Sequence, residues 1–371
     1  MELILGLLLA FSIPLFFLGI IRKFDFYQTG QFQTILLSLV LGGIAYAPAA
    51  FINNTLGYSK LLDHNTIERF IAPVLEETLK ALVLIYLVRR SQFTYTVDGA
   101  LYGFATGIGF AIAENVEYIT QAPSFAVVVA LQRVFSANLV HAFSSAIIGI
   151  ALGISRLETP KIRWLFSTFG WLLAIGQHML FNILIGRDGT HPVIFFLSVL
   201  PGILFMFYFM QRGKRQARGW IKEKLGMESR VTRGEVALVD HLADPEDALY
   251  PVVERFGVGT ANQVEQLLYL QTHIGIKSKA LDGLRDNDMM YKAVEAEINE
   301  MRKKMKKIQN EIGVYPMLFV RGLFTDEMVS VWEQMQSKIE ARSAATGGQK
   351  GGGLWSSLEE RLKSSTDERP E

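Results

Sequence analysis

The chain has 371 residues, of which 50% are hydrophobic and 20% charged, with a formal net charge of +1 and no cysteine. The balanced charge excludes the basic signature of a nucleic-acid-binding protein, and the lack of cysteine excludes disulfides, thiolate metal sites and a cysteine nucleophile. The apolar fraction is high, and the charged residues gather in the last 150 or so positions, which predicts a membrane protein with a water-soluble C-terminal region.

Apolar segments of about 20 residues, the length that crosses roughly 30 Å of hydrocarbon, occur seven times. We expect spans near 2–21, 32–53, 68–88, 97–119, 133–154, 164–185 and 191–211. The apolar stretch 121–132 is followed by Arg133, so we interpret it as an interfacial segment, with a longer tilted span as the alternative. The predicted fold is an all-α, polytopic membrane helix bundle of about seven or eight helices with a C-terminal helical cytoplasmic domain.

The basic residues in the loops between these spans predict the topology, because cytoplasmic loops carry an excess of Lys and Arg. Eleven lie in one set of loops, namely Arg22, Lys23, Arg89, Arg90, Arg156, Lys161, Arg163, Arg212, Lys214, Arg215 and Arg218. The other set holds four, namely Lys60, Arg69, Arg133 and Arg187. We therefore expect a multi-pass cell-membrane protein whose N-terminus is outside and whose C-terminal domain is cytoplasmic.

Four predicted spans carry polar residues that a lipid-facing helix would not tolerate. They are Glu76, Glu77 and Lys80 in the third span, Glu114 in the fourth, His141 in the fifth, and His178 and Asn182 in the sixth. The adjacent carboxylates of Glu76 and Glu77 are the most informative, because each costs roughly 2.5 to 3.5 kcal/mol to place at the centre of a membrane helix. An intramembrane active site is the expected explanation.

Small residues recur at every fourth position on the faces that carry Glu114, His141 and His178, so these side chains are predicted to point into the bundle. At a rise of about 1.5 Å per residue, these residues and Glu76 all lie roughly 8 to 12 Å below the outer membrane surface. Four helices that agree in depth predict one shared site in the outer half of the membrane.

Carboxylates and imidazoles of this kind are suited to activating a water molecule, either through a Glu general base or through a metal that acidifies the water. We expect Glu76 or Glu77 to be the general base, and His141 and His178 to be metal ligands or oxyanion donors. Asn182 could donate a hydrogen bond to the developing oxyanion, and Lys80 could hold the two glutamates in different protonation states. Hydrolysis is the predicted reaction class.

Four segments resemble the motifs of the PrsW family of intramembrane proteases, which is similar to the wider superfamily of CAAX prenyl proteases. They are EETLK at 76–80, FAIAEN at 110–115, His141, and HMLFN at 178–182. The resemblance covers about residues 30–212, and Lys80 and Glu114 favour the PrsW branch. It implies an endopeptidase that cleaves a membrane-anchored protein, such as an anti-sigma factor, near its extracytoplasmic side.

The resemblance nominates Glu76, Glu77, Glu114, His141 and His178 as site residues. The hypothesised metal is divalent, with zinc as the candidate, and its predicted ligands are His141, His178 and Glu114.

Two functions of other classes compete with proteolysis. The first is a catalytically silent membrane scaffold or immunity-type protein, in which Glu76 and Lys80 form a self-neutralising ion pair and each histidine only links helices. The second is a proton-coupled transporter, which the lack of visible inverted repeats disfavours. We interpret Arg133 as an interfacial anchor that pairs with Glu117.

The chain is divided here into a transmembrane protease domain at 1–218, a soluble helical cytoplasmic domain at 219–342, and a flexible linker with a mostly disordered tail at 343–371. Apolar residues repeat at alternating steps of four and three between Val294 and Ile312, which predicts an amphipathic helix. That helix either packs on its own small domain or mediates self-association through 288–312. A cytoplasmic regulator is a further possible partner, besides the protein substrate and the lipid bilayer.

Overall fold

The computed structural model describes residues 1–185, 192–225, 245–284 and 288–322, and within these ranges all regular elements are helices. In chain order they are α1 (Glu2–Arg22), α2 (Phe32–Ser59), α3 (His64–Thr66), the π-helix η1 (Ile67–Ile71), α4 (Ala72–Val88), α5 (Thr96–Gln121), the 3₁₀-helix η2 (Pro123–Phe125), α6 (Ala126–Val134), α7 (Ala137–Ser155), α8 (Pro160–Ile185), α9 (Pro192–Leu225), α11 (Pro245–Asp282), α12 (Asp288–Ile312) and α13 (Val314–Gly322). The predicted tail at 343–371 lies outside the described residues.

Five helical segments of the described chain are long and apolar enough to cross a membrane: α1, α2, α5, the segment Pro123–Ser155, and α8. The all-helical membrane fold is therefore confirmed. The count of seven or eight spans stays a prediction, because α4 and α9 are not among the five. With 17 residues, α4 is about 26 Å long and carries three ionisable side chains on its inner face.

Helices α5 and α7 form the centre of the bundle: 94% of the apolar window of α5 and 89% of that of the segment Pro123–Ser155, which contains α7, are buried, against 22% for α1. Their backbones meet along the predicted stripes of small residues. A methyl group added at Gly99 would lie 2.0 Å from the carbonyl oxygen of Gly149, and one added at Gly107 would lie 2.1 Å from that of His141. Only glycine allows this approach, and it sets His141 directly against α5.

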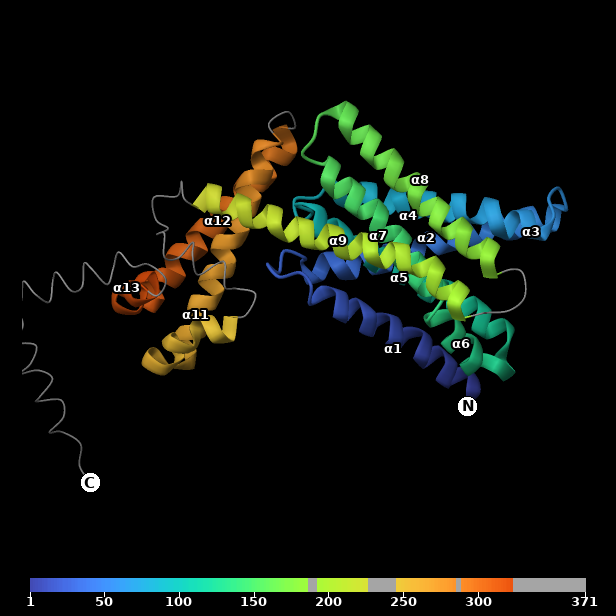
Figure 1. Ribbon diagram of the computed structural model, residues 1–371, viewed down its shortest axis with the longest axis horizontal. Coiled ribbons are helices and arrows are strands. Elements are labelled where there is room, and N and C mark those ends of the chain that lie inside the picture. Colours follow the sequence, from blue (N-terminus) through green and yellow to red (C-terminus); the bar gives the residue numbers. More distant parts are fainter. Residues whose placement is uncertain (186–191, 226–244, 285–287, 323–371) are drawn as a thin grey trace, which may run out of the picture.

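Within the candidate span Pro123–Ser155, α7 begins four residues after the predicted start of the fifth span, because the helix is interrupted at Phe135 and Ser136. The preceding α6 is a separate short helix that packs against α1, where the backbone of Ala126 contacts Gly6. The interruption allows α6 and α7 to run in different directions (Figure 1). Arg133, in the last turn of α6, is thereby directed toward α5.

The C-terminal helices α11, α12 and α13 lie together at one end of the membrane bundle (Figure 1). Val294, Ile298, Met305 and Ile312 on α12 are buried, and α12 packs along α11, so the predicted amphipathic helix is confirmed. Its apolar face is covered within the chain. This arrangement favours the interpretation that α12 packs on its own domain over the alternative of self-association through 288–312.

Polar contacts attach these helices to the loop that follows α4, and we call this region the junction; its residues are Ser91, Gln92, His273, Lys277 and Glu297. The ammonium of Lys277 on α11 donates to the carbonyl of Ser91 at 2.8 Å and pairs with Glu297 on α12 at 2.7 Å. Glu297 also accepts from the hydroxyl of Ser91. His273 donates from Nε2 to the carbonyl of Tyr27 at 2.7 Å.

Candidate active site

The six charged or imidazole residues singled out from the sequence converge at the end of the bundle opposite the junction, and we call them the site cluster. They are Glu76, Glu77, Lys80, Glu114, His141 and His178. They come from α4, α5, α7 and α8, and five of the six are buried, with Glu114 partly so. The sequence therefore identified the members of a compact polar cluster, whose geometry separates their roles.

Glu77 is a fully buried acceptor that holds three donors on one oxygen. Its Oε1 accepts from Lys80 at 2.6 Å, from the hydroxyl of Ser144 at 2.9 Å and from Nδ1 of His178 at 2.9 Å. An unpaired charge at this depth would be very costly, and the three donors offset that cost. Glu77 thus organises the cluster by linking α4, α7 and α8.

Glu76 has far fewer hydrogen bonds than Glu77, although the two residues are adjacent in the chain. Its Oε1 accepts only a long hydrogen bond, from Asn53 at 3.4 Å. Its Oε2 is buried and has no hydrogen-bond partner among the described residues, and it lies 4.0 Å from Nδ1 of His141 and 3.9 Å from Nε2 of His178. Such an acceptor needs a donor or cation between the three groups. One oxygen of Glu77 is also without a partner, but that side chain is fully enclosed, whereas Glu76 is 9% exposed.

The two imidazoles are held in defined orientations. Nδ1–H of His178 donates to Glu77, which leaves the lone pair of Nε2 available toward Glu76. His141 contacts Glu114 through Nε2 at 2.8 Å and Lys80 through Nδ1 at 3.0 Å. Because Lys80 can only donate, Nδ1 of His141 accepts and Nε2 carries the proton. The two rings are nearly perpendicular, at 87°, with centroids 4.8 Å apart.

Arg133 does not pair with Glu117, as the sequence suggested, but with Glu114, one turn earlier on α5. Nη2 lies 2.6 Å from Oε2 of Glu114, and Nε donates to Oδ1 of Asn115 at 2.7 Å. Glu117 instead accepts from the hydroxyl of Tyr46. Our prediction was wrong because the two glutamates share a helix face, so only the placement of α6 distinguishes them.

Three polar residues near the cluster were missed. Ser144 binds Glu77, and Asn115 donates to Asn138 at 2.8 Å. All three are fully buried. Ser144 and Asn138 lie one turn to either side of His141, and that spacing was the available signal.

Asn182, the predicted oxyanion donor, is engaged elsewhere. Its amide donates at 2.8 Å to the backbone carbonyl of Glu68 in the π-helix η1. It thus links the end of α8 to the segment that leads into α4. π-Helical turns are frequent near functional sites, and here the turn directly precedes the helix that carries Glu76.

A divalent metal fits this donor set if the ligand atoms move closer together and Lys80 leaves Nδ1 of His141. Ligand atoms of Glu76, His141 and His178 all lie within 4.8 Å of one another, whereas tetrahedral zinc at about 2.1 Å from each ligand needs spacings of about 3.4 Å. The unpartnered Oε2 of Glu76 supports this fit. The set differs from the predicted one, because Glu76 stands where we expected Glu114, whose Oε2 is engaged by Arg133 and His141.

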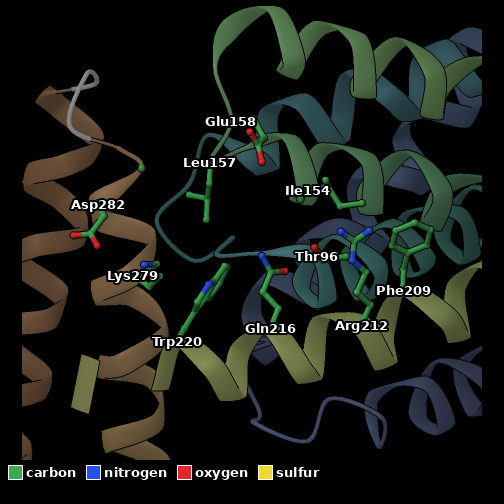
Figure 2. A pocket seen from close by; sticks show the side chains of 12 residues that line it. Thr96, Ile154, Leu157, Glu158, Phe209, Arg212, Gln216, Trp220, Lys279 and Asp282 are labelled. Atoms are coloured by element: carbon green, nitrogen blue, oxygen red, sulfur yellow. The ribbon is translucent and has the colours of Figure 1, made fainter. Parts of the chain in front are cut away.

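A surface cavity of about 370 Å³ lies elsewhere, between the membrane bundle and α11 (Figure 2). Its wall includes Arg212, Gln216 and Trp220 from α9 and Lys279 and Asp282 from α11. None of the residues that line it belongs to the site cluster. The charges contributed by α11 are already compensated, because Lys279 pairs with Glu223 and Asp282 with Lys224. The cavity therefore has no evident part in the chemistry of the cluster.

Comparison with known proteins gives one family. Residues 30–210 match the model of the PrsW family intramembrane metalloprotease. The chain is 26% identical over 196 residues to Protease PrsW of Bacillus subtilis (strain 168), covering 52% of this chain and 87% of that protein. It is 26% identical over 204 residues to Protease PrsW of Geobacillus kaustophilus (strain HTA426), covering 53% and 85%. No solved structure matches the chain.

Proposed function

Residues 30–210 match the PrsW family of intramembrane metalloproteases, and on this premise we propose that the chain is a protease of this family, which hydrolyses a peptide bond of a membrane-anchored protein near the extracytoplasmic face. The substrate class includes single-span proteins such as anti-sigma factors. Residues 1–218 would form the protease domain and 219–342 a cytoplasmic helical domain, with the N-terminus outside. The distribution of basic residues in the loops supports this orientation.

The observation that carries the proposal is the unpartnered Oε2 of Glu76, which faces the imidazoles of His141 and His178. A water molecule placed there would meet a carboxylate acceptor and a lone pair of His178. Glu76 takes a proton from this water, the oxygen adds to the scissile carbonyl carbon, and the C–N bond breaks as the proton passes to the leaving amine.

The remaining members of the cluster hold this geometry. Glu77 accepts hydrogen bonds from Lys80, Ser144 and His178, and these bonds fix α8 against α4 and α7. Glu114 accepts a hydrogen bond from Nε2 of His141 and so, together with Lys80 at Nδ1, favours the Nε2–H tautomer. Each of these carboxylates binds one ring nitrogen of a histidine. Such a contact orients the other ring nitrogen toward a substrate or a metal.

A divalent ion, if bound, would be held by Glu76, His141 and His178, and it would lower the pKa of a bound water and polarise the scissile carbonyl. Lys80 would have to withdraw from Nδ1 of His141, which it contacts at 3.0 Å. Metal analysis of purified protein tests this assignment. We expect about one divalent ion per chain in the wild type, lost in His178→Ala, and loss of cleavage after chelation.

The central experiment incubates purified protein with a panel of tagged single-span membrane proteins that carry extended extracytoplasmic stalks. Wild type is compared with Glu76→Gln, Glu77→Gln, Glu114→Gln, His141→Ala and His178→Ala. We expect Glu76→Gln to lower the cleavage rate by at least about 100-fold, the usual contribution of a general base. Glu158→Gln, at the opposite end of the bundle, is the matched control and should cleave normally. Equal cleavage by wild type and all five site variants would refute a protease and favour the silent scaffold.

A further inference from the structure

Arg133 occupies a position that the sequence did not predict. It lies in the last turn of α6, yet its guanidinium reaches across to α5. Its side chain is 14% exposed, and withdrawing a guanidinium from water to this degree is costly unless other groups compensate it. The groups that contact the guanidinium should therefore include those that compensate its charge.

Three groups on α5 surround the guanidinium. Glu114 provides an ion pair at 2.6 Å, and Asn115 accepts an aligned hydrogen bond from Nε at 2.7 Å. The ring of Tyr118 lies 3.8 Å from Cζ, a cation–π contact. Nη2 has no aligned hydrogen-bond partner in the described ranges, so its contact with Glu114 is an ion pair only. Charge, hydrogen bond and ring together fix the plane of the side chain.

The same contacts connect Arg133 to both helices that supply the Glu114–His141 pair. Asn115, held by Arg133, donates to Asn138 at 2.8 Å, and Asn138 lies one turn before His141 on α7. Oε2 of Glu114, held by Arg133, accepts from Nε2 of His141 at 2.8 Å. Moving the guanidinium would therefore disturb the acceptor of Nε2–H, which together with Lys80 at Nδ1 fixes the tautomer of His141.

We propose that Arg133 is a positioning residue of the proteolytic site, which acts on His141 through Glu114; this inference rests on the proposed function. Arg133 holds one oxygen of Glu114 in place, and Glu114 keeps the proton of His141 on Nε2. Lys80 then meets the lone pair of Nδ1. Arg133 itself touches neither Glu76 nor His178 in the contacts that the structure shows for it.

The first test measures kcat and KM on a panel substrate that the wild type cleaves. Arg133→Met should lower kcat by about 10- to 100-fold, the loss expected when Glu114, the partner behind His141, is no longer held in place, with KM within about twofold. Arg133→Lys keeps the charge but has no guanidinium fork to reach Glu114 and Asn115 together, so it should lose about tenfold. Arg89→Met, an exposed arginine at the other end of α4, is the control and should match the wild type.

The second test is the double variant Glu114→Gln with Arg133→Met. If Arg133 acts through Glu114, the double variant loses no more than Glu114→Gln alone. Multiplied losses would assign Arg133 a separate, structural effect and overturn the proposal, as would wild-type kcat in Arg133→Met.

The third test does not depend on cleavage. In protein labelled with ¹⁵N at the histidine side chains, His141 should give the signal of the neutral Nε2–H tautomer, identified by its loss in His141→Gln. Arg133→Met should shift the Nε2–H signal of His141, because its acceptor Glu114 loses its anchor, and Arg133→Lys should retain more of the original signal. An unchanged His141 signal in Arg133→Met overturns the positioning role. A wild type that cleaves no substrate would refute the proposed function alone, because the tautomer result stands by itself.

Discussion

The site cluster and the junction lie at opposite ends of α4. They differ in how completely their buried charged groups are paired. At the junction, Lys277 meets both the carbonyl of Ser91 and the carboxylate of Glu297. In the site cluster, Lys80 also pairs with a carboxylate, through Oε1 of Glu77, whereas neither oxygen of the neighbouring Glu76 accepts from a charged group, and its Oε2 has no partner among the residues that the structure describes. A buried acceptor left unmet costs about 1 to 3 kcal/mol.

This difference indicates which polar groups stabilise the fold and which serve chemistry. A charged group that is paired with an opposite charge within the protein should stabilise the fold, and its removal should lower stability. A group that faces its neighbours without a partner should be needed for function, and its neutralisation should leave stability unchanged or raise it. Substitutions in the two regions should therefore differ in their effects on stability and on cleavage.

The largest expected difference in stability is between substitutions of the two adjacent glutamates of the site cluster. Glu77→Gln leaves the ammonium of Lys80 buried without its carboxylate, so we expect a loss of about 3 to 5 kcal/mol in the free energy of unfolding, together with loss of cleavage. Glu76→Gln should abolish cleavage while the unfolding midpoint stays level or rises. Circular dichroism during thermal unfolding in detergent measures both.

The double variant Glu77→Gln with Lys80→Met is the matched control, because it removes both charges of the pair. It should unfold at a higher temperature than Glu77→Gln alone. If Glu76→Gln proved as destabilising as Glu77→Gln, the two carboxylates would be equivalent and the proposed division of roles would be wrong.

A smaller loss of stability is expected at the junction. Lys277→Met keeps the apolar stem but removes the donor to Ser91 and Glu297, which should cost about 2 kcal/mol. The change should appear as faster hydrogen exchange in α11 and α12, while the protection of α5 and α7 is unchanged. Lys303→Met removes an exposed pair with Glu300 and should have no measurable effect. Faster exchange confined to α5 and α7 would contradict this prediction.

The sequence predicted the packing of the bundle better than the contacts of its polar side chains. Spacing of small residues is a property of one helix at a time, so it correctly set the faces of Gly99, Gly107 and His141. Whether Arg133 meets Glu114 or Glu117 depends on the break at Phe135 and Ser136, and no pattern in the sequence marks that break clearly.

The roles of Glu76 and Glu77 were open for a similar reason. Both are apolar-flanked carboxylates on the same helix, and local sequence cannot tell one from the other. Ser144 and His178, which donate to Oε1 of Glu77, lie 67 and 101 residues further along the chain. Only the rotation of α4 against α7 and α8 decides which carboxylate they meet.

The smallest expected effect concerns pH at the junction. Partial burial, followed by the nearby charge of Lys277, lowers the pKa of His273 below its usual 6.5, although the carbonyl of Tyr27 and the charge of Asp98 oppose this shift. A lowered pKa means that the unfolded chain binds the proton more readily, so the contribution of His273 to stability is complete above about pH 6.5 and declines as the pH falls toward the folded-state pKa. Hydrogen exchange in α11 should therefore accelerate between pH 7 and pH 5, by less than in Lys277→Met. His273→Gln keeps a donor for Tyr27 but does not titrate, so it should remove this pH dependence; if the dependence persisted in that variant, another group at the junction would be responsible.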